Sequence, residues 1–148
     1  PILGTLYDQR AYCRERKRMT ENKWLQLDQK AKNILIKNDR GGFTVPTAGL
    51  YPYQWNWDSA FAGWGFSTFD TERAWQELES LFAGQWDNGM VPHILFRSND
   101  PDYFPGPDIW GTEECGPISS SGISQPPVAA TFVCVPSGKK IKPLATTD

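Results

Sequence analysis

The first amphipathic stretch of the chain has apolar residues every three or four positions, separated mainly by lysine and aspartate: Trp24, Leu27, Ala31, Ile34 and Leu35. This spacing predicts a helix that ends near Asn38, with Thr20 as its N-cap. The segment 39–52 contains three glycines and two prolines, which predicts a loop across one end of the fold.

Two further helices are predicted after this loop. The segment Trp57–Phe66 is apolar on nearly all sides and contains several small residues, as expected of a buried helix packed closely against its neighbours. A third helix, from Glu72 to about Phe82, has Asp70 or Thr71 as its N-cap. Its apolar stripe is Ala74, Trp75, Leu78, Leu81 and Phe82.

The remaining segments predict loops and one short helix. Residues 85–125 are rich in Gly, Pro, Asn, Asp and Ser, with a strand-like pattern only at His93–Phe96, and a loop this long usually has a function. Two prolines then suit the first turn of a fourth helix, Val128 to about Val135. We therefore expect an all-α fold of helical hairpins over residues 21–135, between an N-terminal extension (1–20) and a solvated tail (136–148).

The composition excludes several classes of partner. Hydrophobic residues make up 39% and charged residues 22% of the 148 residues, which is typical of a folded domain. The net charge of -2 leaves one local basic cluster, Arg14–Arg18, so neither nucleic acid nor an anionic membrane is an expected partner. No stretch approaches the roughly 18 apolar residues of a membrane span.

The cysteines indicate neither disulfides nor metal. Cys13, Cys115 and Cys134 are odd in number, widely spaced and without a CxxC pair, so we expect no disulfide framework, no zinc site and no cofactor. A reducing, cytoplasmic location is the resulting expectation. Because the sequence begins at Pro1 rather than Met, an upstream signal peptide stays open.

The most informative segment is an aromatic run around one carboxylate, Tyr51-Pro-Tyr-Gln-Trp-Asn-Trp-Asp-Ser-Ala-Phe61. Asp58 begins an apolar helix and could simply cap it. Alternatively, it accepts hydrogen bonds from two neighbouring sugar hydroxyls while Tyr51, Trp55 or Trp57 stacks on the sugar ring. Both interpretations can hold together, because a helix start at the end of a barrel also lies at the mouth of a pocket.

Three other loop residues carry a structural and a functional alternative. His93 is the only histidine, and a lone histidine is more often structural than a ligand or base, which is the interpretation we adopt. Tyr103 belongs to an aromatic loop that could pack as a lid over the core. Gln125 precedes two prolines and a helix, where its amide could neighbour the cap or bind a sugar in bidentate fashion.

Four motifs in order, GLYPYQWNWDSAF, GQWDNGMVPHILF, YFPGPDIW and SGISQPP, resemble the start of the catalytic domain in glycoside hydrolase family 63. The similarity is greatest to its branch of mannosylglycerate and glucosylglycerate hydrolases and covers roughly residues 21–135. The resemblance implies part of an (α/α)6 toroid, the six-hairpin glycosidase barrel, with long loops at the substrate end. It also implies an inverting α-glycosidase that acts on a small α-glucoside or α-mannoside.

The resemblance further implies which residues bind the sugar: Tyr51, Trp55, Trp57, Asp58, Tyr103 and Gln125. These residues would recognise the substrate rather than break the bond. The general acid and general base of the relatives lie beyond the position of Gln125, so no catalytic residue is expected within this chain. An inverting enzyme needs two carboxylates about 6.5 to 9.5 Å apart.

Two alternatives stay open beside catalysis. The chain could be a non-catalytic carbohydrate-binding fragment or a nonfunctional remnant of such an enzyme, or a helical interaction protein that uses its aromatic loops for contacts. A partial ring of hairpins would leave an apolar flank exposed, which predicts low stability and self-association. The expected partner of the enzyme and of the binding fragment is a small carbohydrate.

Overall fold

The computed structural model describes residues 21–98 and 100–134. The chain divides into two compact units, 1–33 and 34–148. In the first unit the described residues form one element, helix α2 (Glu21–Asn38), which runs on into the second unit and ends where the sequence predicted. Thr20, the N-terminal extension and the tail 136–148 lie outside the described residues.

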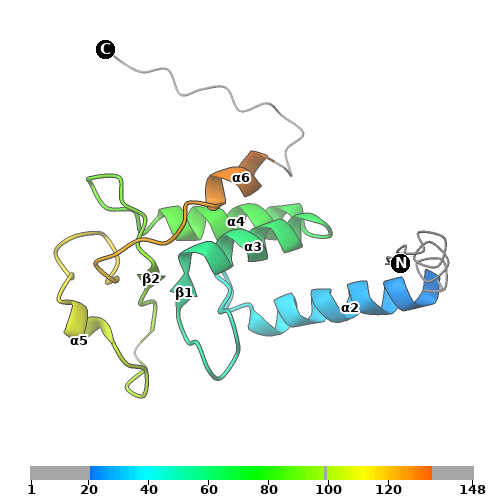
Figure 1. The fold of residues 1–148 in the computed structure, drawn as a ribbon, viewed down its shortest axis with the longest axis horizontal. Coiled ribbons are helices and arrows are strands. Elements are labelled where there is room, and N and C mark those ends of the chain that lie inside the picture. The colour runs from blue at the N-terminus through cyan, green and yellow to red at the C-terminus, as the bar shows by residue number, and fades with distance from the viewer. Residues whose placement is uncertain (1–20, 99, 135–148) are drawn as a thin grey trace, which may run out of the picture. The chain divides into compact units, whose positions relative to one another are not determined.

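The second unit is built on a helical hairpin of α3 (Asn56–Ser67) and α4 (Thr71–Phe82), which lie side by side (Figure 1). Asp70 is the N-cap of α4, and its carboxylate accepts a hydrogen bond from the backbone N–H of Arg73 at 2.9 Å. The buried side of α4 carries Ala74, Leu78 and Leu81. Both predicted helices are therefore confirmed to within two residues at each end.

Helix α3 buries one face and exposes the other. Its small residues, among them Ala60 and Gly63, face the hairpin partner, and a Cβ on Gly63 would lie 3.4 Å from a backbone oxygen of α4. Trp57, Phe61 and Trp64 are 44%, 52% and 43% exposed. The prediction of a helix buried on nearly all sides is therefore wrong, because the large rings lie opposite the small residues that allow the close approach.

A two-stranded antiparallel sheet lies beside the start of α3. Strand β1 (Gln54–Trp55) pairs with β2 (Ile94–Leu95), with Trp55 opposite Ile94. The predicted strand His93–Phe96 is thus present in shortened form, whereas β1 and the short helix α5 (Pro107–Trp110) were not predicted. Residues 119–123 continue the pairing along β2, with three backbone hydrogen bonds of 2.8 to 3.1 Å.

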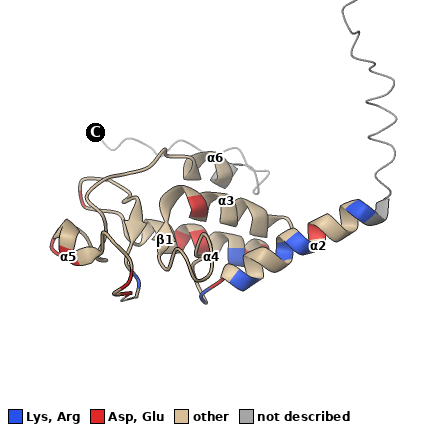
Figure 2. Ribbon diagram, turned by 60° about the horizontal axis from the view of Figure 1, so that its bottom comes forward, with Lys and Arg blue, Asp and Glu red and all other residues tan. Residues whose placement is uncertain are grey.

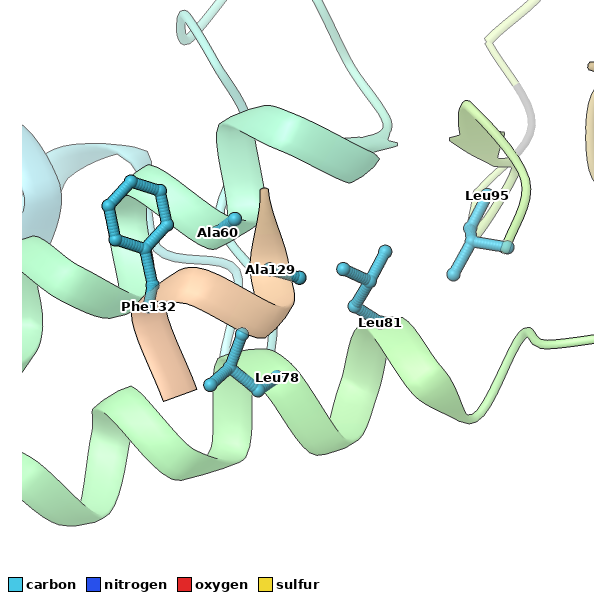
Figure 3. Packing of buried hydrophobic residues seen from close by; sticks show 6 residues of the cluster. All are labelled: Ala60, Leu78, Leu81, Leu95, Ala129 and Phe132. Atoms are coloured by element: carbon cyan, nitrogen blue, oxygen red, sulfur yellow. The ribbon is translucent and has the colours of Figure 1, made fainter. Parts of the chain in front are cut away.

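The core consists of two clusters separated by the sheet. Helix α6 (Ala129–Cys134), close to the predicted fourth helix, packs mainly on α3. Figure 3 shows its Ala129 and Phe132 beside side chains of the hairpin, with Leu95 beyond Leu81 in the same cluster. On the other side of the sheet, an aromatic cluster contains Tyr53, Trp55, Ile94 and Phe96, with Tyr103 and Trp110 packed against it. In β2 the side chain of Ile94 enters the aromatic cluster and that of Leu95 enters the cluster around α6, as the pleat requires.

None of the described helices is both long enough and apolar enough to cross a membrane.

Candidate functional site

A pocket of about 280 Å³ lies where the 39–52 loop, β1, α3 and the segment before α6 meet. Its walls are Pro46, Tyr51, Trp55, Trp57, Asp58 and Gln125. The structure thus brings five of the six predicted sugar-binding residues to one pocket. The sixth, Tyr103, packs against Trp55 with its ring at 5.5 Å.

Local chain geometry places three of these walls. Strand β1 ends at Trp55 and α3 begins at the next residue, so Trp57 and Asp58 fall in the first helical turn. The backbone N–H of Asn56 donates to the carbonyl oxygen of His93 at 3.0 Å, which fixes the helix start against β2. The strand-to-helix transition therefore sets the ring of Trp55 beside the carboxylate of Asp58.

Gln125 reaches the pocket from a segment that is distant in sequence. The N–H of His93 donates to the carbonyl of Ile123 at 2.8 Å, which holds this segment along the sheet. The Oε1 atom of Gln125 then accepts a hydrogen bond from the backbone N–H of Trp57 at 3.1 Å. Gln125 therefore caps α3 across 68 residues of sequence, and the structure supports a capping role for it, although at a different helix from the one expected.

The orientation of the Gln125 amide follows from this bond. A backbone N–H can only donate, so the oxygen of the amide must face Trp57. The amide N–H2 group is then directed elsewhere. A donor pair beside a carboxylate suits a ligand that both accepts and donates hydrogen bonds, as a hydroxyl does.

Asp58 does not cap its own helix. The N-cap residue is Trp55, which makes no side-chain cap hydrogen bond, and Asp58 lies in the first turn, where the helix dipole favours a negative charge. It is the one charged residue of α3, near the start of the helix in Figure 2. Burial raises the pKa of its carboxyl, and hydrogen bonds from its own backbone and the Trp57 side chain partly oppose that shift.

Aromatic rings surround the carboxylate at different depths. Trp55 is buried, with 7% exposure, and Tyr51 meets it edge-on at 5.4 Å. Tyr51 and Trp57 are the exposed rings, at 41% and 44%. Burial raises the pKa of the Tyr103 hydroxyl, and its neighbours Tyr51 and Tyr53 raise it further, so this hydroxyl remains protonated as a donor.

His93 lies outside the pocket and is held by Ser121. Its Nδ1 atom is 2.9 Å from the Ser121 hydroxyl, which also accepts the N–H of Ile94 at 3.1 Å. The serine can then donate its proton to Nδ1, which places the imidazole proton on Nε2. Burial lowers the pKa of His93, so the ring is neutral near pH 7. This geometry agrees with the structural interpretation of His93.

Behind the pocket lies a set of polar residues, five of them buried and three half-buried, that the sequence reasoning did not find. We call it the buried polar cluster, and it comprises Asp39, Thr44, Gln54, Ser59, Arg73, Glu77, Ser80 and Arg97. One signal was available: Arg73 and Glu77 are four residues apart and border the apolar stripe of α4, a spacing that allows them to form an ion pair.

A larger hollow of about 790 Å³ lies at the outer side of the first turns of α4, lined by Asp70, Thr71, Glu72, Arg73, Trp75, Gln76 and Glu79. Its carboxylates, from Asp70, Glu72 and Glu79, are exposed to solvent, and it has a single ring, that of Trp75. The smaller pocket combines rings, an amide and a half-buried carboxylate, so we assign the candidate site there. Among the described residues, no group of three or more His, Cys, Asp and Glu could hold a metal ion.

The fold of the described residues, with its helical hairpin and loop pocket, belongs to the class of helical-toroid glycoside hydrolases. Residues 51–135 match the family described as the mannosylglycerate hydrolase MGH1-like glycoside hydrolase domain, so the chain belongs to that family. Both the resemblance read from the four motifs and the expected fold class are thereby confirmed.

Named relatives give the same result. The mannosylglycerate hydrolase of Thermus thermophilus is 58% identical over 105 residues, which are 70% of this chain and 25% of the relative. The glucosylglycerate hydrolase of Mycolicibacterium hassiacum is 42% identical over 113 residues, which are 73% of this chain and 25% of the relative. A crystal structure of a Thermus thermophilus mannosylglycerate hydrolase from glycoside hydrolase family 63, in complex with Tris and D-glycerate, matches with a TM-score of 0.70 and 53% identity. That match covers 78% of this chain and 27% of the crystallised one. The chain thus spans about a quarter of the length of these relatives.

Proposed function

We propose that the pocket is a subsite for one hexose ring in an α-glycosidase that acts on a small α-mannoside or α-glucoside. The observation that carries this proposal is the half-buried carboxylate of Asp58 between aromatic rings and the Gln125 amide. The volume of about 280 Å³ is just below the roughly 300 to 1,000 Å³ of pockets for drug-sized ligands, which suits a single sugar ring.

The chemistry of each wall matches a part of a pyranose. The carboxylate of Asp58 accepts from two neighbouring hydroxyls, and the Gln125 amide donates to a hydroxyl oxygen. The apolar C–H face of the sugar packs on an aromatic ring, for which Trp57 and Tyr51 present exposed surface. Tyr103 supports the ring of Trp55 from the loop side and supplies a protonated hydroxyl.

The whole reaction is proposed as hydrolysis with inversion, on a mannosylglycerate or glucosylglycerate type of substrate. The names of the relatives and the D-glycerate in the crystallised one support this substrate class. Inversion requires a general acid and a general base, separated by about 6.5 to 9.5 Å. Among the described residues that line the pocket, Asp58 is the one carboxylate, and sugar binding occupies it. We therefore keep the prediction that both catalytic carboxylates come from other parts of the polypeptide.

A second candidate function is sugar binding without hydrolysis by this chain. The single carboxylate in the pocket favours it. The two candidates agree on the ligand and differ only in turnover, so one experiment separates them. An interaction protein without a sugar ligand would show neither property.

The test is isothermal titration of the 148-residue chain with mannose, glucose, mannosylglycerate and glucosylglycerate, followed by assay of each sample for released sugar. Binding without release supports a subsite that lacks the acid and base. Release would show that a working carboxylate pair lies within the chain and would contradict the assignment of Asp58 to binding alone. The absence of any heat with all four ligands would refute the subsite.

Variants sharpen this test. Asp58→Ala is expected to abolish binding, because it removes the only charged acceptor of the pocket. Asp87→Ala, an exposed aspartate outside the pocket, is the matched control and should leave affinity unchanged. Equal affinity of the two variants would contradict the role of Asp58.

The pH dependence of affinity follows from the environment of Asp58. Burial raises its pKa, and the ionised form is the one that accepts two hydroxyls. Affinity should therefore be full at neutral pH and fall as the pH drops, beginning above the ordinary range of an aspartic acid. The affinity for mannose, measured at a series of acidic pH values, tests this. A decrease in affinity that begins only at the ordinary aspartate pKa would contradict the burial argument.

Self-association stays a prediction. The exposed rings of α3 give it a physical basis, because contiguous apolar surface favours association in water. Sedimentation velocity of the chain at several concentrations measures it, and a concentration-independent monomer would contradict it.

A further inference from the structure

Two fully buried residues flank the pocket walls in sequence. Gln54 immediately precedes Trp55 in β1, and Ser59 immediately follows Asp58 in α3. Both have no exposed surface, and neither lines the pocket. Since consecutive residues of a strand point to opposite faces, the side chain of Gln54 lies behind the wall that Trp55 forms.

The amide of Gln54 connects the two walls. Its Nε2 donates to the Ser59 hydroxyl at 3.0 Å and lies 3.4 Å from a carboxylate oxygen of Glu77. Its Oε1 accepts from the Nε of Arg97 at 2.7 Å and from the Ser80 hydroxyl at 3.3 Å. Arginine only donates and a carboxylate only accepts, so the orientation of this amide is fixed by its neighbours.

Glu77 anchors a third wall of the same pocket. Its carboxylate accepts from the backbone N–H of Thr44 at 3.1 Å and from the Thr44 hydroxyl at 2.7 Å. Thr44 lies two residues before Pro46, which lines the pocket. Asn38 holds Pro46 from the other side, because its side-chain amide donates to the Pro46 carbonyl at 3.1 Å.

We propose that Gln54 is a positioning residue of the sugar subsite, which fixes the spacing between the ring of Trp55 and the carboxylate of Asp58 through its bond to Ser59. Glu77 holds the Gln54 amide in place. The inference rests on the proposed sugar subsite. The inference extends that proposal from the residues that touch a hexose to the residues that set the geometry of the subsite.

Two serine variants separate positioning from general stability. Ser59→Ala removes the acceptor that links Gln54 to α3 and leaves Nε2 with contacts of 3.4 Å and longer. Ser80→Ala removes a hydroxyl from the same amide, but Oε1 keeps its 2.7 Å bond to Arg97. Both changes delete one hydroxyl oxygen beside the Gln54 side chain. Only Ser59→Ala affects the helix that carries Asp58 next to the substituted residue.

The first measurement needs no ligand. In NMR spectra of the free 148-residue chain, the side-chain carboxyl of Asp58 is titrated with pH, and cross-peaks between the Trp55 ring and α3 are compared. Ser59→Ala should move the pKa of the Asp58 carboxyl toward the ordinary aspartate range and weaken the cross-peaks between the Trp55 ring and α3. Ser80→Ala should change neither. Ser59→Cys, which is slightly larger and keeps a weak acceptor, should give an intermediate result and serves if the alanine variant does not fold.

The second measurement is the affinity for mannose and glucose. Loss of one hydrogen bond that orients the carboxylate predicts an affinity about three- to tenfold weaker for Ser59→Ala, against less than about twofold for Ser80→Ala. Equal NMR titrations and equal affinities in the two alanine variants would overturn the positioning role. If the unmodified chain binds neither sugar, the proposed function fails, and the NMR comparison still decides whether Ser59 and Gln54 position Asp58.

Discussion

The substitution Glu77→Gln tests the buried polar cluster with almost no change in shape. The carboxylate of Glu77 has no exposed surface and accepts four hydrogen bonds, from Arg73, from the backbone and hydroxyl of Thr44, and from Gln54. An amide offers only one accepting oxygen in this space. The amide N–H2 group must therefore replace one of the two carboxylate oxygens and face the donors that bonded to it.

The neighbours of Glu77 decide which orientation the new amide adopts. If its nitrogen replaces Oε1, it meets the N–H of Thr44 and the Nε2 of Gln54, which Arg97 prevents from turning over. If it replaces Oε2, the Thr44 hydroxyl can turn and accept, but Arg73 still opposes it. The second orientation leaves one conflict rather than two and should be favoured.

The expected loss follows from this conflict. Hydrogen bonds to charged groups contribute about 1.5 to 3 kcal/mol, and removing one partner of a buried ion pair costs about 3 to 5 kcal/mol. Arg73 retains Asp39, to which its Nε and Nη2 atoms both donate at 2.9 Å, so its charge is not left unpaired. We therefore expect Glu77→Gln to lower the free energy of unfolding by about 2 to 4 kcal/mol.

Glu79→Gln is the matched control, since it makes the same chemical change two residues along α4 at an exposed position. Surface changes of this kind stay within about 0.5 kcal/mol. The assay is urea unfolding of both variants at neutral pH, followed by tryptophan fluorescence, with the slope of the transition compared between them. A loss for Glu77→Gln no larger than that for Glu79→Gln would refute the reasoning.

Two further predictions concern packing and acid stability. A Cβ on Gly84 would lie 2.3 Å from the side chain of the buried Leu95. Gly84→Ala should therefore lower the free energy of unfolding in urea by about 1 to 3 kcal/mol. Gly63→Ala is the control and should not lower it, because a Cβ there would lie at ordinary contact distance from its neighbours. The bond from Arg73 lowers the pKa of Asp39, so that carboxylate stabilises the fold above the ordinary aspartate range and loses this contribution as the pH falls through its lowered pKa. Asp39→Asn should therefore flatten the acid side of a plot of melting temperature against pH.

The sequence was sufficient where structure depends on near neighbours. Helix α4 follows from its apolar spacing, and its Asp70 cap follows from the place of that residue before Thr71. Helix α3 follows from a short run of apolar and small residues, which also places Trp57 and Asp58 together in its first turn. Segments this short carry their geometry in their own residues, so a pattern can predict them.

The remaining features depend on contacts between distant residues. Strand β1 has two residues, too few for an alternating pattern to show. Thr44 meets Glu77 across 33 residues, and Gln54 meets Arg97 across 43. Apolar periodicity tells which side of an element is buried, but it does not tell which polar groups will meet there. The same limit explains the error at α3, whose all-round apolar sequence did not show that Trp57, Phe61 and Trp64 are exposed while Phe66 is buried.

The shortness of β1 gives the buried polar cluster its importance. A pair of two-residue strands is marginal by itself, yet β1 carries one wall of the pocket and leads directly into the next. Sugar recognition depends on hydrogen bonds that tolerate little displacement, so the walls need a constraint beyond the short β1–β2 ladder. Gln54 supplies it to the pocket side through Ser59 and is itself held from the side of α4 by Glu77. Substitution of Glu77 should therefore affect the stability of the fold most, and substitution of Ser59 the affinity for the sugar most, although the Gln54 amide contacts both residues.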